Sequence, residues 1–589
     1  MGKTPGRLPF VWRPGTAICA VYFGLLQTPD GREFRRAAPR PGGLLLSGEE
    51  DKRRLESERR GPRAVFASCA AGSAVSPACF RAPLGGTAHG LEQGRYPPGG
   101  ETALGESIFR KGLSMKSSES KKHKILIANR GEIAIRIMQA CRKLGLDFVA
   151  LFTEPDRHSE HCVLARNLGG EDSLYRVSAY LDANEIFAVA DHSGATAIHP
   201  GYGFFAEDYR FARRVAQREH KLIFIGPSWQ VIRELGDKIN TKRLARKLGV
   251  PTVPGSDRPV TDGLEAEDIA RSLFAFQKEQ GVNNPVILVK ASAGGGGMGI
   301  EEVDDPDKFR SVLRRIKNYA KRQFRDEGVL IEQRIFDFNH LEVQVLADRT
   351  GQNPVHFGTR NCSVQSLGRQ KRIEVAPGFD PSSLRYAFDA KKVLEDITEY
   401  SLRMAREAGY DNVGTWEWIV SPTGQPFLME VNTRIQVENG VSARIASIKG
   451  RGDVDLIAEQ IRVGLGAPLG YAQQDIRLGG VGIEYRIIAE DPDNRFAPWV
   501  GRITSFDWPE QPWLTVHTQV PRDREYEIPT DFDPNLALAI IWGKDLDEAR
   551  ARGQEFLDTL TLAGENAGGE PLKSNIAFLK RKTEKILVF

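Results

Sequence analysis

Five polar side chains occupy alternate positions in the stretch FLMEVNTRIQVENG, residues 427–440. They comprise two carboxylates, two amides and one guanidinium: Glu430, Asn432, Arg434, Gln436 and Glu438. Residues two apart in an extended strand lie on one face, so a strand running into a loop would aim this row into one cleft. The intervening apolar residues would then face the core: Phe427, Met429, Val431, Ile435 and Val437. An edge strand with a solvated face is the alternative, although such a face rarely lacks both Lys and Ser.

A glycine-rich segment, AGGGGMGI at residues 293–300, directly follows the strand pattern VILVK. Glycine lets backbone N–H groups wrap phosphate oxygens where side chains would collide. The segment matches neither the P-loop nor the dinucleotide-binding pattern, and glycines alone would make an ordinary flexible loop. Lys290 on the preceding strand favours phosphate binding, because a fixed Lys can neutralise phosphate charge. Lys238 offers a second cation.

Two glutamates could hold a magnesium ion beside the phosphates of ATP. Mg²⁺ prefers hard oxygen ligands, which Glu417 and Glu430 supply, and Asn432 adds a carbonyl oxygen. Taken singly, Lys238 and Glu417 could instead form surface salt bridges. The sequence therefore indicates, but does not by itself fix, a site for a nucleotide and a metal.

The elements that position these residues begin at Lys124. The stretch KILIANRGEIAIRIMQACRKLG predicts a buried strand, a turn at residues 129–131 and a helix with apolar residues at helical spacing. Three further strands are predicted at DFVALFT, ATAIHPGYG and KLIFIGPS. Strands that alternate with helices imply a parallel sheet with ligands at the carboxyl ends of its strands. This first unit ends near residue 235.

A second unit contains the strand patterns VILVK, VLIEQRI, HLEVQVLAD, GTWEWIV and the 427–440 segment. Their alternating polar residues predict a mixed or antiparallel sheet with one wet face. A third unit starts near GGVGIEYRIIAEDP, with strands at ITSFDW and LALAIIWG and a helix at LDEARARGQEFLDTL. A chain of 589 residues is long enough for three or more domains.

The first 114 residues differ in composition from the rest of the chain. They hold 11 of the 33 prolines and carry a net charge of +7, whereas the remainder carries −3. The overall charge of +4 therefore gives no indication of nucleic-acid binding by the main body. We expect residues 1–114 to be a disordered extension or a misassigned start, with translation beginning at Met115.

The cysteine content and the hydropathy of the sequence indicate the cellular environment of the protein. Six cysteines without framework spacing favour a reducing, cytoplasmic environment over a disulfide scaffold. No CxxC pair or zinc signature occurs, and no apolar run approaches the roughly 18–20 residues of a membrane helix.

The ordered motifs of the body resemble the biotin carboxylase family of the ATP-grasp fold. The matching stretches are ILIANRGEIAIRI, AIHPGYGFFAED, FIGPS, GDK, KASAGGGGMG, HLEVQVLAD, GTWEWI, MEVNTRIQVE and EYRIIAEDP. The resemblance implies an α/β (α+β) fold in three parts. These are an N-terminal doubly wound parallel-sheet domain (122–235), a central ATP-grasp domain (237–465) with a glycine-rich lid (about 250–335), and a C-terminal mixed α/β domain (478–585).

The resemblance also implies a role for each matching residue. ATP phosphates would be held by Lys238, Lys290, Gly296 and Gly297. The rest of the nucleotide would contact Glu332, Gln333, Arg334, Ile335, His340 and Gln365, with His340 at the ribose. Mg²⁺ or Mn²⁺ would be held by Glu417, Glu430 and Asn432. Bicarbonate would be bound by Lys371, Arg434, Gln436 and Val437, with Glu438 as the base and Arg486 stabilising the biotin enolate.

The same resemblance implies partners and a pathway. The chain contains no Met-Lys-Met biotinylation site, so biotin would arrive on a biotin carboxyl carrier protein, and the carboxyltransferase would be formed by separate subunits. We expect a homodimer that serves acetyl-CoA carboxylase, and hence fatty acid biosynthesis, or a related carboxylase. The final acceptor stays open.

Three departures from the family pattern keep two alternatives open. Arg369 replaces a His in a loop with one inserted residue, Asn439 replaces a His after the candidate base, and the chain ends earlier than expected. One alternative is a non-catalytic, nucleotide-binding scaffold protein. The other is an ATP-grasp ligase that acts on a different carboxylate.

Overall fold

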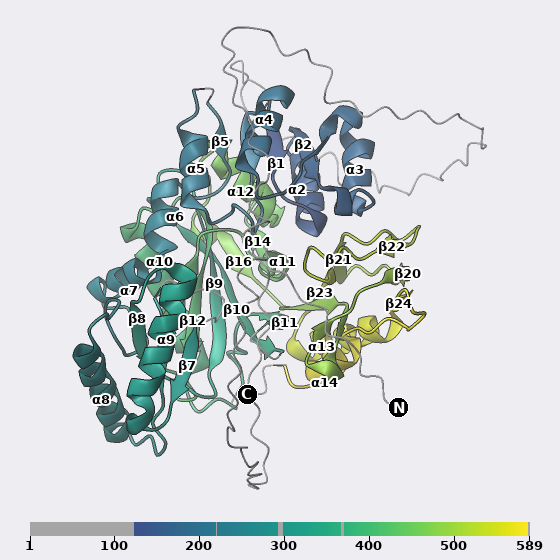
Figure 1. Cartoon of the computed structure of the whole chain (residues 1–589). Coiled ribbons are helices and arrows are strands. Elements are labelled where there is room, and N and C mark those ends of the chain that lie inside the picture. The colour runs from purple at the N-terminus through teal and green to yellow at the C-terminus, as the bar shows by residue number, and fades with distance from the viewer. Residues whose placement is uncertain (1–122, 220, 293–298, 367–369, 384, 587–589) are drawn as a thin grey trace, which may run out of the picture. The chain divides into compact units, whose positions relative to one another are not determined.

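The computed structural model describes residues 123–219, 221–292, 299–366, 370–383 and 385–586 (Figure 1). The first unit forms the predicted parallel sheet, with strand order β3-β2-β1-β4-β5. Its strands are β1 (Lys124–Ile127), β2 (Asp147–Phe152), β3 (Leu174–Arg176), β4 (Ala197–His199) and β5 (Ile223–Phe224). Its helices are α2 (Gly131–Lys143), α3 (Glu160–Gly169), α4 (Ala183–Ser193), α5 (Tyr209–Ala216) and α6 (Trp229–Leu235). Of these five strands, only β3 was not predicted, because two partly buried residues and one exposed residue give no hydrophobic pattern.

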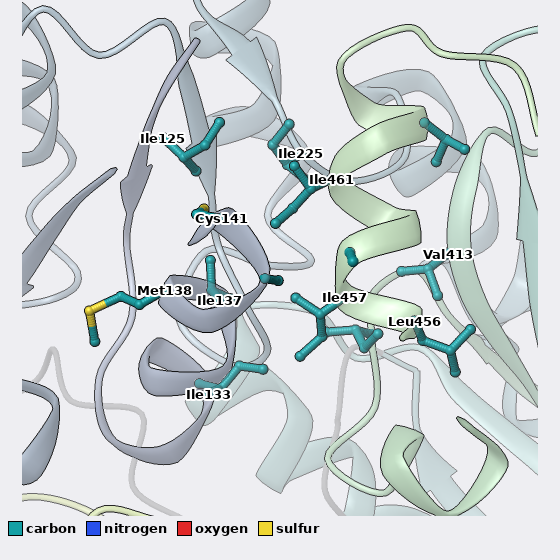
Figure 2. Close-up of a cluster of buried hydrophobic side chains, with 14 of the residues drawn as sticks. Ile125, Ile133, Ile137, Met138, Cys141, Ile225, Val413, Leu456, Ile457 and Ile461 are labelled. Atoms are coloured by element: carbon teal, nitrogen blue, oxygen red, sulfur yellow. The ribbon is translucent and has the colours of Figure 1, made fainter. Parts of the chain in front are cut away.

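Helix α2 begins at a glycine for a steric reason. Gly131 has φ +64°, and a Cβ there would lie 2.1 Å from Oε1 of Gln519. The apolar face of α2 packs against α12 (Leu456–Gly464). Figure 2 shows this cluster, in which Ile137 and Ile457 are each no more than 2% exposed. The first unit therefore shares one hydrophobic core with α12 and with residues of later strands, among them Leu346, Phe357 and Val413.

The second unit carries a small antiparallel sheet and the helices that pack against it. The sheet has strand order β7-β6-β8, formed by β6 (Ile287–Ala291), β7 (Ile300–Val303) and β8 (Val329–Gln333). Its helices are α8 (Gly263–Glu279) and α9 (Phe309–Phe324), and α7 (Lys238–Lys247) precedes them. The glycine segment connects β6 to β7, and its residues 293–298 lie outside the described residues.

An eight-stranded antiparallel sheet runs through the rest of the chain in the order β13-β12-β9-β10-β11-β17-β23-β21. The strands are β9 (Asn339–Ala347), β10 (Val355–Gln365), β11 (Lys371–Ala376), β12 (Asn412–Val420), β13 (Pro426–Asn432), β17 (Val481–Ile488), β21 (Leu514–Thr518) and β23 (Asn535–Gly543). The sequence analysis placed β9, β12 and β13 in the second unit and β17 and β23 in the third, and it did not predict β10, β11 or β21. The pairing of β11 with β17 joins the strands of both units into one sheet.

The remaining elements cover this sheet or flank it. They are α10 (Ala390–Glu407), α11 (Asn439–Ile445), α13 (Leu546–Thr559), α14 (Ile576–Thr583), β14 (Ala446–Ile448), β15 (Gly452–Asp453), β16 (Ile476–Leu478), β18 (Glu490–Asp491), β19 (Ala497–Pro498), β20 (Arg502–Asp507), β22 (Tyr526–Glu527) and β24 (Thr561–Glu565). None of the described helices is both long enough and apolar enough to cross a bilayer. The three described cysteines are buried and free of disulfides.

The prediction of a wet sheet face was wrong. Every residue of β9 is buried, including the polar residues His340, Glu342 and Gln344. Helix α11 packs against β10, β11 and β17, and helix α10 packs against β9 and β10. The polar side chains of β9 therefore bind polar groups on neighbouring strands instead of water, which offsets the cost of burying them.

Candidate active site

Three glutamates lie side by side across the central sheet. Glu417 of β12 is the register partner of Glu342 on β9 and of Glu430 on β13, and directly opposite residues have Cβ atoms about 4.5–5.5 Å apart. Arg360 of β10 lies opposite Glu342 on its other side. The sheet thus gathers acidic groups that are distant in sequence, and nearby cations must offset their mutual repulsion.

A bulge in β13 sets which residues join this row. Glu430 pairs with Glu417, but the next pair is Leu428 with Trp418, so Met429 is an extra residue. Leu428 consequently lies in the core and Phe427 and Met429 are only partly buried, contrary to the predicted core row, whereas Val431 and Ile435 are buried as predicted. Strand β13 ends at Asn432, and Arg434, Gln436 and Glu438 come from the loop that follows.

Lys371 is the cation at the centre of the acidic row. Its Nζ donates to Glu342, to Glu438 Oε1 at 2.8 Å and to Glu417 Oε1 at 3.4 Å. Burial opposes the charge of Lys371, yet these carboxylates, Glu342 foremost, hold its pKa well above the usual range. Lys371 is therefore charged at neutral pH, as a partner of the buried acids must be.

Glu438 lies between two cations. It is 1% exposed, it accepts from Lys371, and its Oε2 accepts from Arg486 Nη2 at 3.0 Å. Burial alone would raise the pKa of Glu438, but Lys371 and Arg486 hold it below the usual range. Glu438 is consequently an ionised carboxylate.

Glu417 is the most heavily hydrogen-bonded member of the row. Its Oε1 accepts from Asn432 Nδ2 at 2.7 Å and from Gln436 Nε2 at 3.0 Å, and its Oε2 lies 2.8 Å from His340 Nε2. Burial would raise the pKa of Glu417, but Lys371 and His340 hold it well below the usual range. Glu417, Glu430 and Asn432 thus offer two carboxylates and an amide oxygen, a hard donor set that fits Mg²⁺.

Arg434 has each side of its guanidinium engaged. Its Nε donates to Glu207 Oε2 at 3.1 Å, Nη1 to Gln436 Oε1 at 2.5 Å, and Nη2 to Asn432 Oδ1 at 3.2 Å. Glu207 also accepts from the backbone N–H of Thr433 at 2.9 Å. This acid therefore fixes the loop as well as the guanidinium, and it ties the first unit to the site.

A second cluster of lysines faces β8 and β13. Lys238 lies 2.8 Å from Glu430, and both Lys242 and Lys290 pair with Glu332. Burial would raise the pKa of Glu332, but the two lysines lower it to about 2. The predicted cations Lys238, on α7, and Lys290, on β6, thus each have an acidic partner that a phosphate group could replace.

The other predicted nucleotide contacts spread along the ends of β8 and β10. Gln365 Nε2 lies 3.1 Å from His340 Nδ1, and Gln333 is the last residue of β8. Arg334 pairs with Glu302, and its guanidinium lies 4.6 Å from the Phe336 ring centroid. Ile335 and Val437 are partly buried. Gly296, Gly297 and Arg369 lie outside the described residues.

Comparison with protein families accounts for most of the chain. Residues 121–232 match the model for the biotin carboxylase N-terminal domain, and residues 484–584 match that for the biotin carboxylase C-terminal domain. Residues 237–472 match the ATP-binding domain of the carbamoyl-phosphate synthase L chain. A biotin carboxylase from a Nostoc species is 37% identical over 441 residues, which cover 75% of this chain and 92% of the relative.

The chain belongs to the biotin carboxylase family.

Other members of the biotin carboxylase family have equally close sequences. The small subunit of 2-oxoglutarate carboxylase from Hydrogenobacter thermophilus is 37% identical over 446 residues, covering 75% of this chain and 87% of the relative. The crystal structure of the biotin carboxylase domain dimer of that organism's 2-oxoglutarate carboxylase has a TM-score of 0.67 and 36% identity. It covers 78% of this chain and 93% of that domain, and it was solved with MgADP, ADP and bicarbonate.

Several residues of this biotin carboxylase site escaped the sequence analysis. They are Glu207, Lys242, Glu342, Arg360 and Glu374. Glu207 and Glu342 stand within the family-like stretches AIHPGYGFFAED and HLEVQVLAD, so a signal was present but carried no assigned role. Arg360, which is fully buried against Glu342 Oε2 at 2.7 Å, could be recognised only after β10 was placed beside β9.

Proposed function

We propose that this chain uses ATP and bicarbonate to carboxylate biotin, through carboxyphosphate, as the first half-reaction of a biotin-dependent carboxylase. One observation carries the proposal above all. Glu438 is a buried, ionised carboxylate bridged by Lys371 at 2.8 Å and by Arg486 at 3.0 Å. A base in this position can reach a substrate held by either cation.

The first step is the activation of bicarbonate. Bicarbonate is a poor nucleophile until a base removes its proton, and Glu438 accepts that proton within hydrogen-bond reach. Arg434 would exchange its hydrogen bonds to Gln436 and Asn432 for the resulting dianion. Its planar fork is better suited to a carboxylate than the single ammonium group of Lys. Lys371 keeps the surrounding acids from repelling the dianion.

The second step transfers the γ-phosphoryl group. A bicarbonate oxygen forms a bond to phosphorus, the bond to ADP breaks, and carboxyphosphate results. Lys238 and Lys290 would exchange Glu430 and Glu332 for phosphate oxygens, and the glycine segment would cover them. Glu417, Glu430 and Asn432 would hold Mg²⁺, which would supply positive charge to the phosphates.

The third step moves the carboxyl group to biotin. Carboxyphosphate breaks down to CO₂ and phosphate, and the released phosphate accepts the proton of the biotin ureido nitrogen. Arg486 stabilises the resulting enolate while that nitrogen attacks CO₂. Arg486 also contacts Glu438, so the base and the enolate-stabilising group lie within one hydrogen bond of each other. This arrangement holds the activation of bicarbonate and the carboxylation of biotin in one place, which lowers the entropy cost of bringing the reactants together.

We also propose the wider setting that the family suggests. Biotin would arrive on a separate carrier protein, carboxyltransferase subunits would complete the enzyme, and two copies of this chain would form a dimer in the cytoplasm. Relatives named as subunits of pyruvate and 2-oxoglutarate carboxylases support a multi-subunit enzyme. Acetyl-CoA carboxylase, and thus fatty acid synthesis, is one candidate among these systems. Three domains at 122–235, 237–465 and 478–585 are part of the same proposal.

Transfer of ¹⁸O tests the chemistry directly. Because the attacking oxygen of bicarbonate stays on phosphorus, ¹⁸O-bicarbonate should give inorganic phosphate with one ¹⁸O per turnover. Glu438→Gln should abolish this label while the variant still binds ATP. Unlabelled phosphate from a bicarbonate-dependent reaction would refute carboxyphosphate. ATP binding without any turnover would instead favour the scaffold alternative.

A further inference from the structure

Two fully buried glutamates face each other behind Arg486. Glu374 of β11 and Glu484 of β17 are register partners on adjacent antiparallel strands, and both are 0% exposed. Directly opposite residues have Cβ atoms about 4.5–5.5 Å apart, so their carboxyl groups can meet. Two buried carboxylates without intervening cations would repel each other strongly.

The hydrogen bonds leave this pair one proton short. Glu374 Oε1 accepts from Arg486 Nε at 2.7 Å, and Arg486 Nη2 lies 2.5 Å from the same oxygen. Glu374 Oε2 and both oxygens of Glu484 have no hydrogen-bond partner among the described residues. Ionised carboxylates only accept hydrogen bonds, whereas a protonated carboxyl also donates one. A single proton between the two groups would therefore pair Glu374 Oε2 with one of the two Glu484 oxygens.

We propose that Glu484 is held as the neutral acid and donates its proton to Glu374 Oε2, and that this acid–carboxylate pair positions Arg486. Glu374 then keeps the negative charge that binds the guanidinium of Arg486. The hydrogen bond from Glu484 holds the Glu374 carboxylate in the orientation that contacts Arg486. Both glutamates act through Arg486 and are positioning residues. The proposal rests on the proposed function only for the role of Arg486.

The surrounding charges support this assignment. The charged groups that act on the pair are Arg486, Arg136, Lys371 and Glu438. Burial raises the pKa of Glu484 well above its usual range, and the charge of Glu374 raises it further. A raised pKa keeps the proton bound to a higher pH than usual, which favours the neutral form of Glu484. Arg486 then faces two carboxylates, Glu374 and Glu438, instead of three.

Infrared difference spectroscopy of the full chain tests the protonation state without requiring activity. Wild type minus Glu484→Gln at pH 7 should show the C=O stretch of a protonated carboxyl, shifted in D₂O. Glu459→Gln is the matched control, because Glu459 forms an ion pair with Arg462 at 2.7 Å and does not contact Glu374 or Glu484. The spectrum of Glu459→Gln should still contain the band of the protonated carboxyl. Absence of the band from the Glu484→Gln difference would overturn the proposal.

Kinetics test the positioning role. Glu484→Gln keeps a donor and should retain most of the biotin-stimulated rate. Glu484→Met fills a similar space without a donor and should lose about 10- to 100-fold, the usual effect of removing a supporting partner. Bicarbonate-dependent ATP hydrolysis without biotin should change far less. If Glu484→Met kept the same biotin-stimulated rate as Glu484→Gln, the side chain would serve packing alone and the positioning role would be refuted. If the wild-type protein itself showed no stimulation by biotin, the proposed function would be refuted instead.

Discussion

Replacing Lys371 by methionine tests whether a buried cation holds the acidic row together. Lys371 is 15% exposed and contacts Glu342, Glu438 at 2.8 Å and Glu417 at 3.4 Å. Breaking a buried ion pair by removing one partner typically costs about 3–5 kcal/mol, because the remaining charge is left unpaired. We therefore expect Lys371→Met to lower the free energy of unfolding by about that amount at pH 8.

The pH dependence of this loss identifies its cause. In the wild type, Glu438 and Glu417 have lower pKa values in the folded state than in the unfolded state. They therefore stabilise the fold at any pH above their unfolded-state pKa, and this stability is lost as the pH falls through their folded-state pKa values. Without Lys371 these folded pKa values rise above the unfolded ones. The penalty should then be largest at pH 8 and shrink toward pH 5, where protonation removes the unpaired charge.

Urea unfolding of both proteins at the two pH values measures the effect. Lys143→Met provides the control, because Lys143 is 51% exposed and lies 3.4 Å from Asp455; solvent screens such a pair to roughly 0–1 kcal/mol. A loss below about 1 kcal/mol for Lys371→Met at pH 8, or an equal loss at both pH values, would refute the electrostatic reasoning.

Three further predictions concern the loop, its support and the core. Arg434→Ala should reduce bicarbonate-dependent turnover by about 10²–10³-fold, the usual effect of losing a charge-stabilising donor, with an unchanged urea midpoint; near-normal turnover would contradict its role. Glu207→Gln should raise the KM for bicarbonate by about 10- to 100-fold, since Arg434 loses its charged partner. An unaltered KM would show that Gln436 and Asn432 are enough to hold Arg434 in place. Ile457→Ala should cost about 2–5 kcal/mol in urea unfolding, whereas Leu264→Ala, at a position 71% exposed, should cost little; similar losses would argue against the α2–α12 core.

Local patterns predicted the elements that depend on local sequence. The α2 helix and β1 were predicted because their apolar residues recur at helical or strand spacing, and these are the residues that are buried. The alternation of Glu430 and Asn432 also predicted a shared face correctly. It failed at Met429, because the bulge there depends on how β12 pairs with β13, and that pairing is not written in either strand.

Long-range pairing explains what the sequence could not predict. Glu342, Arg360 and Glu374 are ordinary polar positions in separate strands until the sheet order makes them neighbours. The same holds for the joining of two expected sheets through β11 and β17. The family resemblance supplied the roles of Glu438 and Arg486, whereas their hydrogen bonds to Lys371 and Glu374 required the structure.

The rate of ATP hydrolysis by the full chain, measured with and without bicarbonate and each with and without free biotin, tests the central claim most directly. A biotin carboxylase that uses Glu438 as its base should hydrolyse ATP only with bicarbonate, should turn over faster with biotin, and should lose both responses in Glu438→Gln. Hydrolysis that is independent of bicarbonate, or that persists unchanged in Glu438→Gln, would contradict the account.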